Sequence, residues 1–270
     1  ADYLSLAGTL HGETSPPVWA TLSGGFSTLA HTTGTRAEQA KIGEIWSNIA
    51  RPQLEALGFD RPEGEDDPLV NEVRASLYSS LGSLSHDDAV ISHARQIFDA
   101  TIETTNASLE AAAIRVIAST GSRGDYDEIF RRFQEATSPQ AERRYMFALS
   151  RFDDAQAIAD LCDRTLDGSI RSQDAAFVLG LTIGNRWHGQ QAWSFVTENW
   201  DRISDTVPDN AVGRMLGGIE WLEHGDVPAV HAFLDAHQVP QAKLSILQHR
   251  ERLDIHQALA HRIGPEIASR

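Results

Sequence analysis

Apolar side chains recur along this chain every three or four residues, which is the period of an α-helix. Such stripes bury one face of each helix against a neighbouring surface. No run of residues has the strict alternation of a half-buried strand. The clearest stripes are Ile42, Ile45, Trp46 and Ile49; Val90, Ile91, Ala94, Ile97, Phe98 and Ile102; Tyr126, Ile129, Phe130 and Phe133; and Trp193, Val196, Trp200 and Ile203. The pattern therefore predicts an all-α protein.

The residues between the stripes are typical of helix ends. Ser138 followed by Pro139 is a helix cap with proline at the first helical position, and Ser85 with Asp88 resembles a capping box. Together the stripes and these ends predict helices at residues 2–11, 16–31, 35–57, 66–83, 86–104, 107–119, 124–136, 139–150, 153–166, 170–183, 187–203, 209–223, 226–237 and 241–262.

One stretch interrupts the helical pattern. Residues 58–67, GFDRPEGEDD, are acidic and contain proline and glycine, so we expect an exposed loop. We treat the chain as a single α-helical domain, residues 1–270. In it the acidic loop separates a helical cluster at 1–57 from a longer array of helices at 68–270.

The spacing of the later helices predicts a repeat architecture. From about residue 107 they follow one another as antiparallel pairs of roughly 30–40 residues, the spacing of HEAT-like repeats. Stacked pairs of this kind form an α-solenoid with a concave face. We therefore expect a HEAT-like α-solenoid of antiparallel helix pairs.

The net negative charge of the chain and its lack of long apolar stretches limit the kinds of partner that it can bind. Its 270 residues have a formal net charge of −15, so nucleic-acid phosphates would be repelled. No window approaches the ~18 apolar residues that a membrane span needs. We expect neither nucleic acid nor a membrane as partner. The sequence leaves the compartment open.

A search for catalytic and metal-binding motifs is negative. The chain has no H-E-x-x-H, no G-x-x-x-x-G-K-[ST], no G-x-G-x-x-G and no G-x-S-x-G. His249 and His256 are seven residues apart, and no histidine pair has the i, i+3 or i, i+4 spacing of a helical zinc site. Cys162 is the single cysteine, which excludes a disulfide within the chain. We expect no metal and no cofactor in this chain.

Two short motifs have simple structural interpretations. Asn106-Ala-Ser108 matches the glycosylation sequon, a triplet that is common by chance. Arg123-Gly-Asp125 matches a cell-adhesion tripeptide, but it lies where one helix ends and the next begins. We expect a turn there, with Asp125 capping the following helix.

One group of charges stands out from the acidic background. Five arginines lie within 21 residues, namely Arg131, Arg132, Arg143, Arg144 and Arg151. They could bind a carboxylate through charge-assisted hydrogen bonds. The favoured alternative is a solvated face on which they pair with Glu135 and Glu142, because surface charge clusters are a weak signal.

Read in order, several segments resemble the C-terminal helical domain of the aminopeptidase N-like zinc peptidases, a domain that the endoplasmic-reticulum aminopeptidases also carry. The most specific part is an ordered set of short motifs. They are Arg171-Ser-Gln-Asp174, Gly184-Asn-Arg186, Ala192-Trp-Ser-Phe195 and Glu198-Asn-Trp200. Weaker matches are Glu13-Thr-Ser-Pro-Pro-Val-Trp19, Asn106 to Phe133 and Ser138 to Asp153. The resemblance spans nearly the whole chain.

The resemblance implies a domain that arches over the active site and encloses the peptide-binding cavity without breaking bonds itself. Zinc and the catalytic residues are then expected on an upstream catalytic domain of the same polypeptide, and peptides are the expected substrates. The sequence is expected to be an excised piece of that polypeptide. No catalytic or metal residue can be assigned in this chain.

The stretch LDGSIRSQDAAFVLG, which begins at residue 166, contains the Arg171 motif and allows two interpretations. In the favoured one it is a joint between helices, where Ser169 or Ser172 caps a helix and Arg171 bridges Asp174 or the preceding carbonyls. In the other, Arg171 and Gln173 face the peptide.

The candidate peptide-cavity residues are therefore Arg171, Gln173, Arg143 and Arg144. The candidate structural residues of the joint are Asp174, Trp193 and Trp200. Two other functions stay open. The first is a free-standing HEAT-like scaffold that binds a protein partner on its concave face. The second is an enzyme with an unfamiliar all-helical site, which the motif search disfavours.

Overall fold

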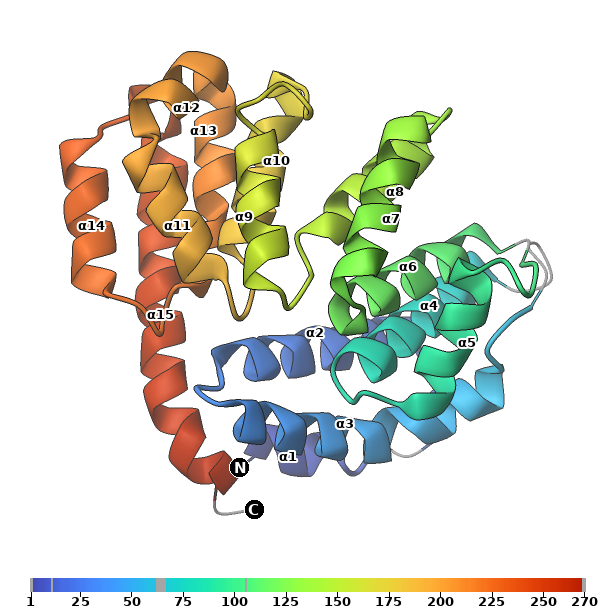
Figure 1. The fold of residues 1–270 in the computed structure, drawn as a ribbon. Helices are drawn as coiled ribbons and strands as arrows, with labels where there is room; N and C mark the ends of the chain where they lie inside the picture. The colour runs from blue at the N-terminus through green and yellow to red at the C-terminus, as the bar shows by residue number, and fades with distance from the viewer. Residues whose placement is uncertain (1, 11, 62–66, 105, 269–270) are drawn as a thin grey trace. The chain divides into compact units, whose positions relative to one another are not determined.

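The structure is a computed structural model that describes residues 2–10, 12–61, 67–104 and 106–268. Within these ranges every regular element is a helix and no strand occurs (Figure 1). The prediction of an all-α protein is therefore confirmed. Residues 62–66 of the predicted acidic loop lie outside the described residues.

The chain divides into two compact units. The N-terminal unit comprises residues 1–121 together with 263–270, and the C-terminal unit comprises residues 122–262. The division follows Gly121. The helices on either side of the 58–67 loop belong to the same unit and pack against each other.

Helix α4 lies at the centre of the N-terminal unit, because α2, α3, α5 and α6 all pack against it. The helices of this unit are α1 (Asp2–Ala7), α2 (Pro16–Thr32), α3 (Arg36–Leu57), α4 (Pro68–Ser83), α5 (Asp88–Phe98) and α6 (Ala107–Thr120).

The core of the N-terminal unit is built around Trp46, which is fully buried. Its ring lies 4.7 Å from that of Phe26 and 6.4 Å from that of Trp19. The indole Nε1 donates to Oγ of Ser80 at 3.0 Å. The apolar stripe that the sequence predicted on α3 thus packs against α2 and α4, and its polar atom is satisfied.

A buried arginine on α4 binds the last backbone carbonyls of α3. Arg74, on α4, is 1% exposed. Its Nε donates to the carbonyls of Leu57 (3.3 Å) and Gly58 (3.1 Å), its Nη2 donates to the carbonyl of Leu57 at 3.2 Å, and its Nη1 donates to Asn71. The last carbonyls of a helix have no partner within the helix. Arg74 supplies the donors and places a positive charge at the negative end of the helix dipole.

The asparagine of the glycosylation sequon is a buried helix cap. Asn106 is 4% exposed, and its Oδ1 accepts from the amides of Ser108 and Leu109, both at 3.1 Å. Its Nδ2 donates to the carbonyl of Arg61 at 3.3 Å. This side chain therefore starts α6 and ties it to the segment that follows α3.

The predicted capping box of Ser85 and Asp88 is wrong. Asp87 caps α5 by accepting from two amides of the first turn, both at 3.1 Å. The hydroxyl of Ser85 donates instead to the carbonyl of Gly43 at 2.7 Å. That carbonyl comes from another helix, so the choice between the two possible caps depends on tertiary contact.

In the C-terminal unit, helices pack both on the next helix along the chain and on helices further away. Helix α7 packs on α8, α9 packs on α11, and α10 packs on α8, α11 and α13. The elements of this unit are α7 (Arg123–Glu135), α8 (Pro139–Leu149), α9 (Ala155–Arg164), α10 (Ser172–Ile183), α11 (Gly189–Glu198), α12 (Trp200–Thr206), α13 (Asp209–Met215), η1 (Leu216–Trp221), α14 (Val227–Ala236), η2 (Pro240–Ala242) and α15 (Lys243–Ala268), of which residues up to 262 belong here.

The cell-adhesion tripeptide forms the first turn of α7. Asp125 accepts from the amide of Ser122 at 2.7 Å and from its hydroxyl at 3.0 Å. Arg123 pairs with Asp127 and Asp160. The N-cap is Ser122, and Asp125 is the third residue of the helix, where it completes a capping box. The expected turn is therefore wrong, and Asp125 contributes to the cap from within the helix.

Several predicted helices end earlier than the apolar pattern does. The predicted helix 187–203 is interrupted at Asn199, whose backbone has a φ of −111° and a ψ of 19°. Its backbone amide and its side-chain Nδ2 both donate to the carbonyl of Phe195, at 3.0 Å and 2.9 Å. The predicted helix 86–104 stops at Phe98, because Ala100 has the positive φ of 55° that ends the turn. The predicted helix 209–223 changes to a 3₁₀ helix at Leu216.

We expect Arg74→Ala to lower the free energy of unfolding by about 2–3 kcal/mol, because it leaves the buried carbonyls at the end of α3 without donors. Arg74→Lys keeps the charge but loses the planar set of donors, so its effect should be intermediate. Urea denaturation followed by circular dichroism measures both changes.

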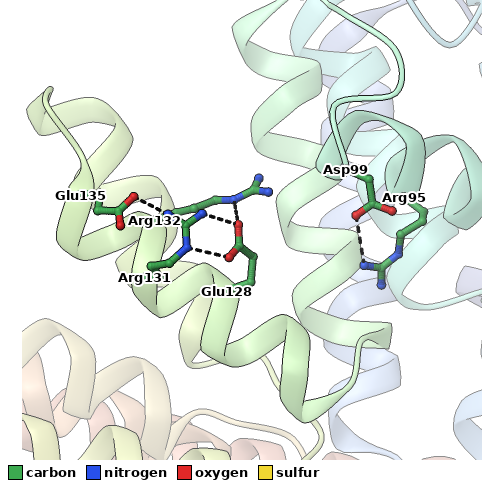
Figure 2. Close-up of polar contacts among 6 residues, drawn as sticks. All are labelled: Arg95, Asp99, Glu128, Arg131, Arg132 and Glu135. Carbon is green, nitrogen blue, oxygen red and sulfur yellow. Dashed lines mark hydrogen bonds and ion pairs between the residues drawn. The ribbon is translucent and has the colours of Figure 1, made fainter.

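The control is Arg95→Ala. Arg95 forms a partly exposed pair with Asp99, with 3.8 Å between Nη1 and Oδ1 (Figure 2). Exposed pairs contribute less than about 1 kcal/mol. If Arg74→Ala and Arg95→Ala unfold at the same urea concentration, Arg74 has no special role at the end of α3.

Candidate functional site

The sequence stretch around Arg171 forms an exposed ion-pair joint between α8 and α10. Nη2 of Arg171 lies 2.8 Å from Oε1 of Glu142 on α8, and its Nε donates to Oδ2 of Asp174 at 3.0 Å. The Arg171 side chain is 59% exposed, whereas that of Asp174 is 13% exposed. The hydrogen bond to Asp174 and the charges of Asp174 and Glu142 raise the pKa of Arg171. The bridge from Arg171 to Asp174, one of the two arrangements considered from the sequence, is therefore present.

The expected serine cap of α10 is wrong. Arg171 occupies the N-cap position, and no side chain caps the helix. The amide of Ser169 donates to Oδ1 of Asp167 at 2.7 Å, in a turn where Gly168 has a φ of 89°. This hydrogen bond lowers the pKa of Asp167. The serines therefore belong to the turn and to the first residue of the helix, and Asp174 supplies the negative charge near the helix start.

Gln173 lies on the exposed face of α10. It is followed at four-residue spacing by Phe177, which is half-buried, and by Leu181, which is 42% exposed. The ring of Phe177 lies 6.4 Å from that of Phe147 on α8, and the guanidinium of Arg214 lies 4.4 Å above it. The α8, α10 and α13 helices therefore present polar, aromatic and aliphatic groups on neighbouring surfaces.

The arginines of α7 are neutralised by carboxylates on the same helix. Figure 2 shows Glu128 facing both Arg131 and Arg132, and Arg131 also facing Glu135. Hydrogen bonds from Arg131 and then Arg132 lower the pKa of Glu128 to about 2. Two cations and two anions therefore cancel on this exposed face, which fits the solvated-face alternative at this part of the cluster.

The arginines of α8 differ from those of α7. Arg143 is exposed, and no described residue forms a hydrogen bond or ion pair with it. Arg144 is half-buried and engaged in contacts. Glu142, expected to pair within the cluster, pairs instead with Arg171. Arg143 is thus the member of the cluster that keeps its charge available to solvent.

The two tryptophans of the predicted joint meet at one phenylalanine. The rings of Trp193, on α11, and of Trp200, on α12, lie edge-on to Phe233 of α14, at 5.2 Å and 5.3 Å. Trp193 is 4% exposed. Edge-to-face aromatic contacts of this kind stabilise the packing of helices, so both residues hold α14 against its neighbours.

Asn185 fixes the connection between α10 and α11. It is 8% exposed, and its Nδ2 donates to the carbonyls of Ser150 (2.8 Å) and Phe152 (3.1 Å). Its Oδ1 accepts from the amides of Trp187 (3.0 Å) and His188 (2.9 Å). The side chain makes four hydrogen bonds, all that its amide group can form. The asparagine of the Gly184-Asn-Arg186 motif therefore has a structural role.

A cluster on α15 was missed by the sequence analysis. Oε1 of Glu220, in η1, lies 2.5 Å from Nδ1 of His249 and 3.0 Å from Nη1 of Arg252. His249 Nε2 lies 2.9 Å from the carbonyl of Gly213, and His256 Nδ1 lies 2.6 Å from the carbonyl of Glu220. Glu220 is 9% exposed. The only available signal was the spacing of His249, Arg252 and His256 on one helical face, and no pattern pointed to Glu220.

The arrangement favours a structural role for this cluster. A general base needs a free ring nitrogen that can reach a substrate proton. Both nitrogens of His249 face protein oxygens, at Glu220 and Gly213. The ring therefore joins α15 to η1 and α13 and has no nitrogen left for a substrate.

Two further observations concern the parts of the chain that the structure describes. No group of three or more His, Cys, Asp or Glu side chains is placed to bind a metal ion. None of the described helices combines the length and the apolar character that crossing a membrane requires.

Comparison with known proteins identifies the family. A family model described as the ERAP1-like C-terminal domain matches residues 1–255. The chain belongs to this family. The resemblance to the C-terminal helical domain of aminopeptidases, inferred from the ordered motifs, is thereby confirmed.

The curated relatives are aminopeptidases. Aminopeptidase M1-D of Oryza sativa subsp. japonica is 28% identical over 206 residues, which is 69% of this chain and 23% of that protein. Alanine/arginine aminopeptidase of Saccharomyces cerevisiae is 24% identical over 226 residues, 81% of this chain and 26% of that protein. Aminopeptidase N of Lactobacillus helveticus is 24% identical over 175 residues, 63% and 20% respectively. The ERAP1-like domain thus spans about a fifth to a quarter of the length of these relatives.

We expect His249→Ala to lower the free energy of unfolding of the ERAP1-like domain by about 1–3 kcal/mol, because the buried carboxylate of Glu220 keeps only Arg252 as a side-chain partner and the imidazole contact with the carbonyl of Gly213 is lost. Thermal and urea unfolding measure the change. The control is Arg250→Ala, since Arg250 pairs with the exposed Asp235 at 2.6 Å and should contribute less than about 1 kcal/mol. Equal effects of the two substitutions would refute a special role for His249.

Proposed function

We propose that this chain is the non-catalytic C-terminal domain of a zinc-dependent aminopeptidase. In this function it encloses the peptide-binding cavity over the active site of a catalytic domain on the same polypeptide. The observation that carries the proposal is the family match over residues 1–255. It is supported by relatives that are named aminopeptidases and that have about three quarters or more of their length outside the matched segment.

The zinc ion of such an enzyme belongs to the upstream domain. This chain lacks H-E-x-x-H, and its described residues contain no side-chain group that fits a metal. Zinc in a peptidase polarises the carbonyl and activates the attacking water. We assign no step of that reaction to residues of this chain, whose contribution is the shape and charge of the cavity wall.

The wall is proposed to be a HEAT-like α-solenoid with a concave face. Within the C-terminal unit, α8 packs on α10 and α10 packs on α13, while α9 packs on α11. Two rows of helices of this kind are what stacked antiparallel pairs produce. The row of α8, α10 and α13 carries the exposed candidate residues, so we propose it as the concave, peptide-facing row.

Four residues of α8 and α10 are proposed to face the peptide. Arg143 and Gln173 are exposed and available for contact. Arg171 is exposed but engaged with two carboxylates, and Arg144 is half-buried. This ranks Arg143 first, because a cation with no carboxylate partner attracts a peptide carboxylate more strongly than one that is already neutralised.

The alternative is a free-standing HEAT-like scaffold that binds a protein partner. The exposed apolar groups Leu181, Leu244, Leu247 and Ile255 favour an interaction surface in either case. The reading frame distinguishes the two functions. An upstream frame of several hundred codons that encodes H-E-x-x-H supports the aminopeptidase, whereas a start codon directly before Ala1 supports the scaffold.

The test of the proposed function compares three proteins: the complete gene product, its part upstream of Ala1, and this chain alone. We expect one zinc per complete protein, zinc in the upstream part, and none in this chain after dialysis. Aminoacyl chromogenic substrates should be hydrolysed by the first protein and not by the third. A zinc content of 1:1 in this chain, or turnover above a buffer blank, would contradict the proposal.

Arg143→Ala in the complete enzyme tests the proposed peptide contact. We expect KM to rise for peptides with a free C-terminal carboxylate, by a factor of about 10 where the contact is shielded from water. Amidated peptides should be unaffected. The matched control is Arg131→Ala, an exposed arginine whose charge Glu128 and Glu135 already neutralise. An unchanged ratio of the two KM values excludes Arg143 from peptide binding.

A further inference from the structure

The C-terminal unit buries a carboxyl group without giving it a hydrogen-bond donor. Glu223 is 3% exposed, and within the described residues neither of its carboxyl oxygens accepts a hydrogen bond. Glu220, three residues earlier, is also buried but has His249 and Arg252 as partners. Glu223 is therefore a buried acid whose negative charge is less well compensated than that of Glu220.

The residue lies in a tightly packed turn between η1 and α14, residues 222–226, which we call the Glu223 turn. A Cβ atom added to Gly225 would meet Oε1 of Gln190, on α11, at 2.1 Å. A Cβ atom added to Gly189 would lie 3.6 Å from the side chain of Leu222. The turn therefore sits directly against the start of α11, and the Glu223 side chain is buried.

Two basic groups face the Glu223 carboxyl. Arg186, in the connection between α10 and α11, attracts its negative form. Nε2 of His224 lies 3.5 Å from its Oε1. Burial raises the pKa of Glu223 to about 7. Its own backbone amide, and then the charge of Arg186, reduce this rise without cancelling it. The neutral carboxyl is thus the form that suits the closed turn over the acidic range.

We propose that Glu223 is a proton-controlled latch, which keeps the Glu223 turn closed against α11 while its carboxyl is neutral and releases the turn when the carboxyl ionises. A buried carboxylate without donors is costly, because the desolvation of an ion amounts to several kcal/mol. Moving the short turn outward gives the carboxylate water. The segments that separate are residues 222–226 and the start of α11.

The direction of the pH dependence follows from the two protonation equilibria. Below about pH 4.5 the carboxyl is protonated in both the closed and the open turn, so the equilibrium constant for opening does not depend on pH. Between about 4.5 and 7 the closed turn retains a proton that the open turn releases, so opening increases as pH rises. Above about pH 7 the carboxyl is ionised in both the closed and the open turn, so the opening constant no longer changes with pH. Across this window the opening constant should rise by a factor on the order of 100.

The experiment is amide hydrogen exchange on the 270-residue chain at pH 5 and pH 8, with rates corrected for the intrinsic effect of pH. We expect the protection of amides in residues 219–227 to fall by a factor on the order of 100 between these conditions. In Glu223→Gln, which cannot ionise, the protection should be the same at both pH values. Glu251→Gln, at an exposed acid of α15, is the matched control and should behave as wild type.

A second measurement covers the case in which Glu223→Gln does not fold. In a carbon-13 titration of the wild-type glutamate carboxyls, the Glu223 resonance should have a midpoint near pH 7, well above the ordinary value for a glutamate. The latch is refuted by an ordinary midpoint for Glu223, by protection that does not change with pH, or by an equal change in Glu223→Gln. Because this chain is used alone, the result is independent of whether the aminopeptidase function holds.

Discussion

The ends of the helices impose the strongest constraint on this protein. A chain made of short helices has many ends, and each end leaves backbone donors or acceptors without helical partners. Where ends are buried, a polar side chain has to enter the core to satisfy them. Arg74 does this for the carbonyls at the end of α3, and Asn106 does it for the first amides of α6. Asn185 binds carbonyls of the connection before α9 and amides of the connection before α11. The packing of the apolar faces depends on these few polar groups.

The same constraint separates two classes of charged residue. Buried charges such as Arg74 and Glu220 bind groups from other helices, and they determine which elements lie together. Exposed arginines such as Arg131 pair with carboxylates on their own helix and determine nothing beyond it. Arg171 falls between the classes, since it links α8 to α10 but stays exposed. Five arginines close together in the sequence therefore drew attention to a cluster that mostly pairs locally. Glu220, which links separate helices, had no comparable signal in the sequence.

Membership of the ERAP1-like C-terminal domain family gives these features a functional setting. In the proposed function, a domain that covers an active site needs a firm scaffold and a surface that can accept varied ligands. The firm part is the network of buried polar residues at the helix ends. The α8 and α10 surfaces, with Arg143, Gln173 and the half-buried Phe147 and Phe177, are the more adaptable part. In the C-terminal unit the Glu223 turn adds a place where proton uptake can alter packing, without any change in the rest of the unit.

The sequence by itself determined the helical class, most helix positions and the family. Apolar periodicity and proline or serine at helix starts are local signals, and they suffice for α3, α7 and α8. Ordered motifs such as Arg171-Ser-Gln-Asp174 carried the family resemblance. Only the tertiary structure decided which polar residues act. Ser85 does not cap α5, because its hydroxyl donates to the carbonyl of Gly43 on another helix. The predicted helix 187–203 is interrupted at Asn199, where the backbone leaves the helical conformation. Glu220 and His249 are 29 residues apart, and no local pattern pairs them, because a hydrogen bond between helices depends on how the chain packs.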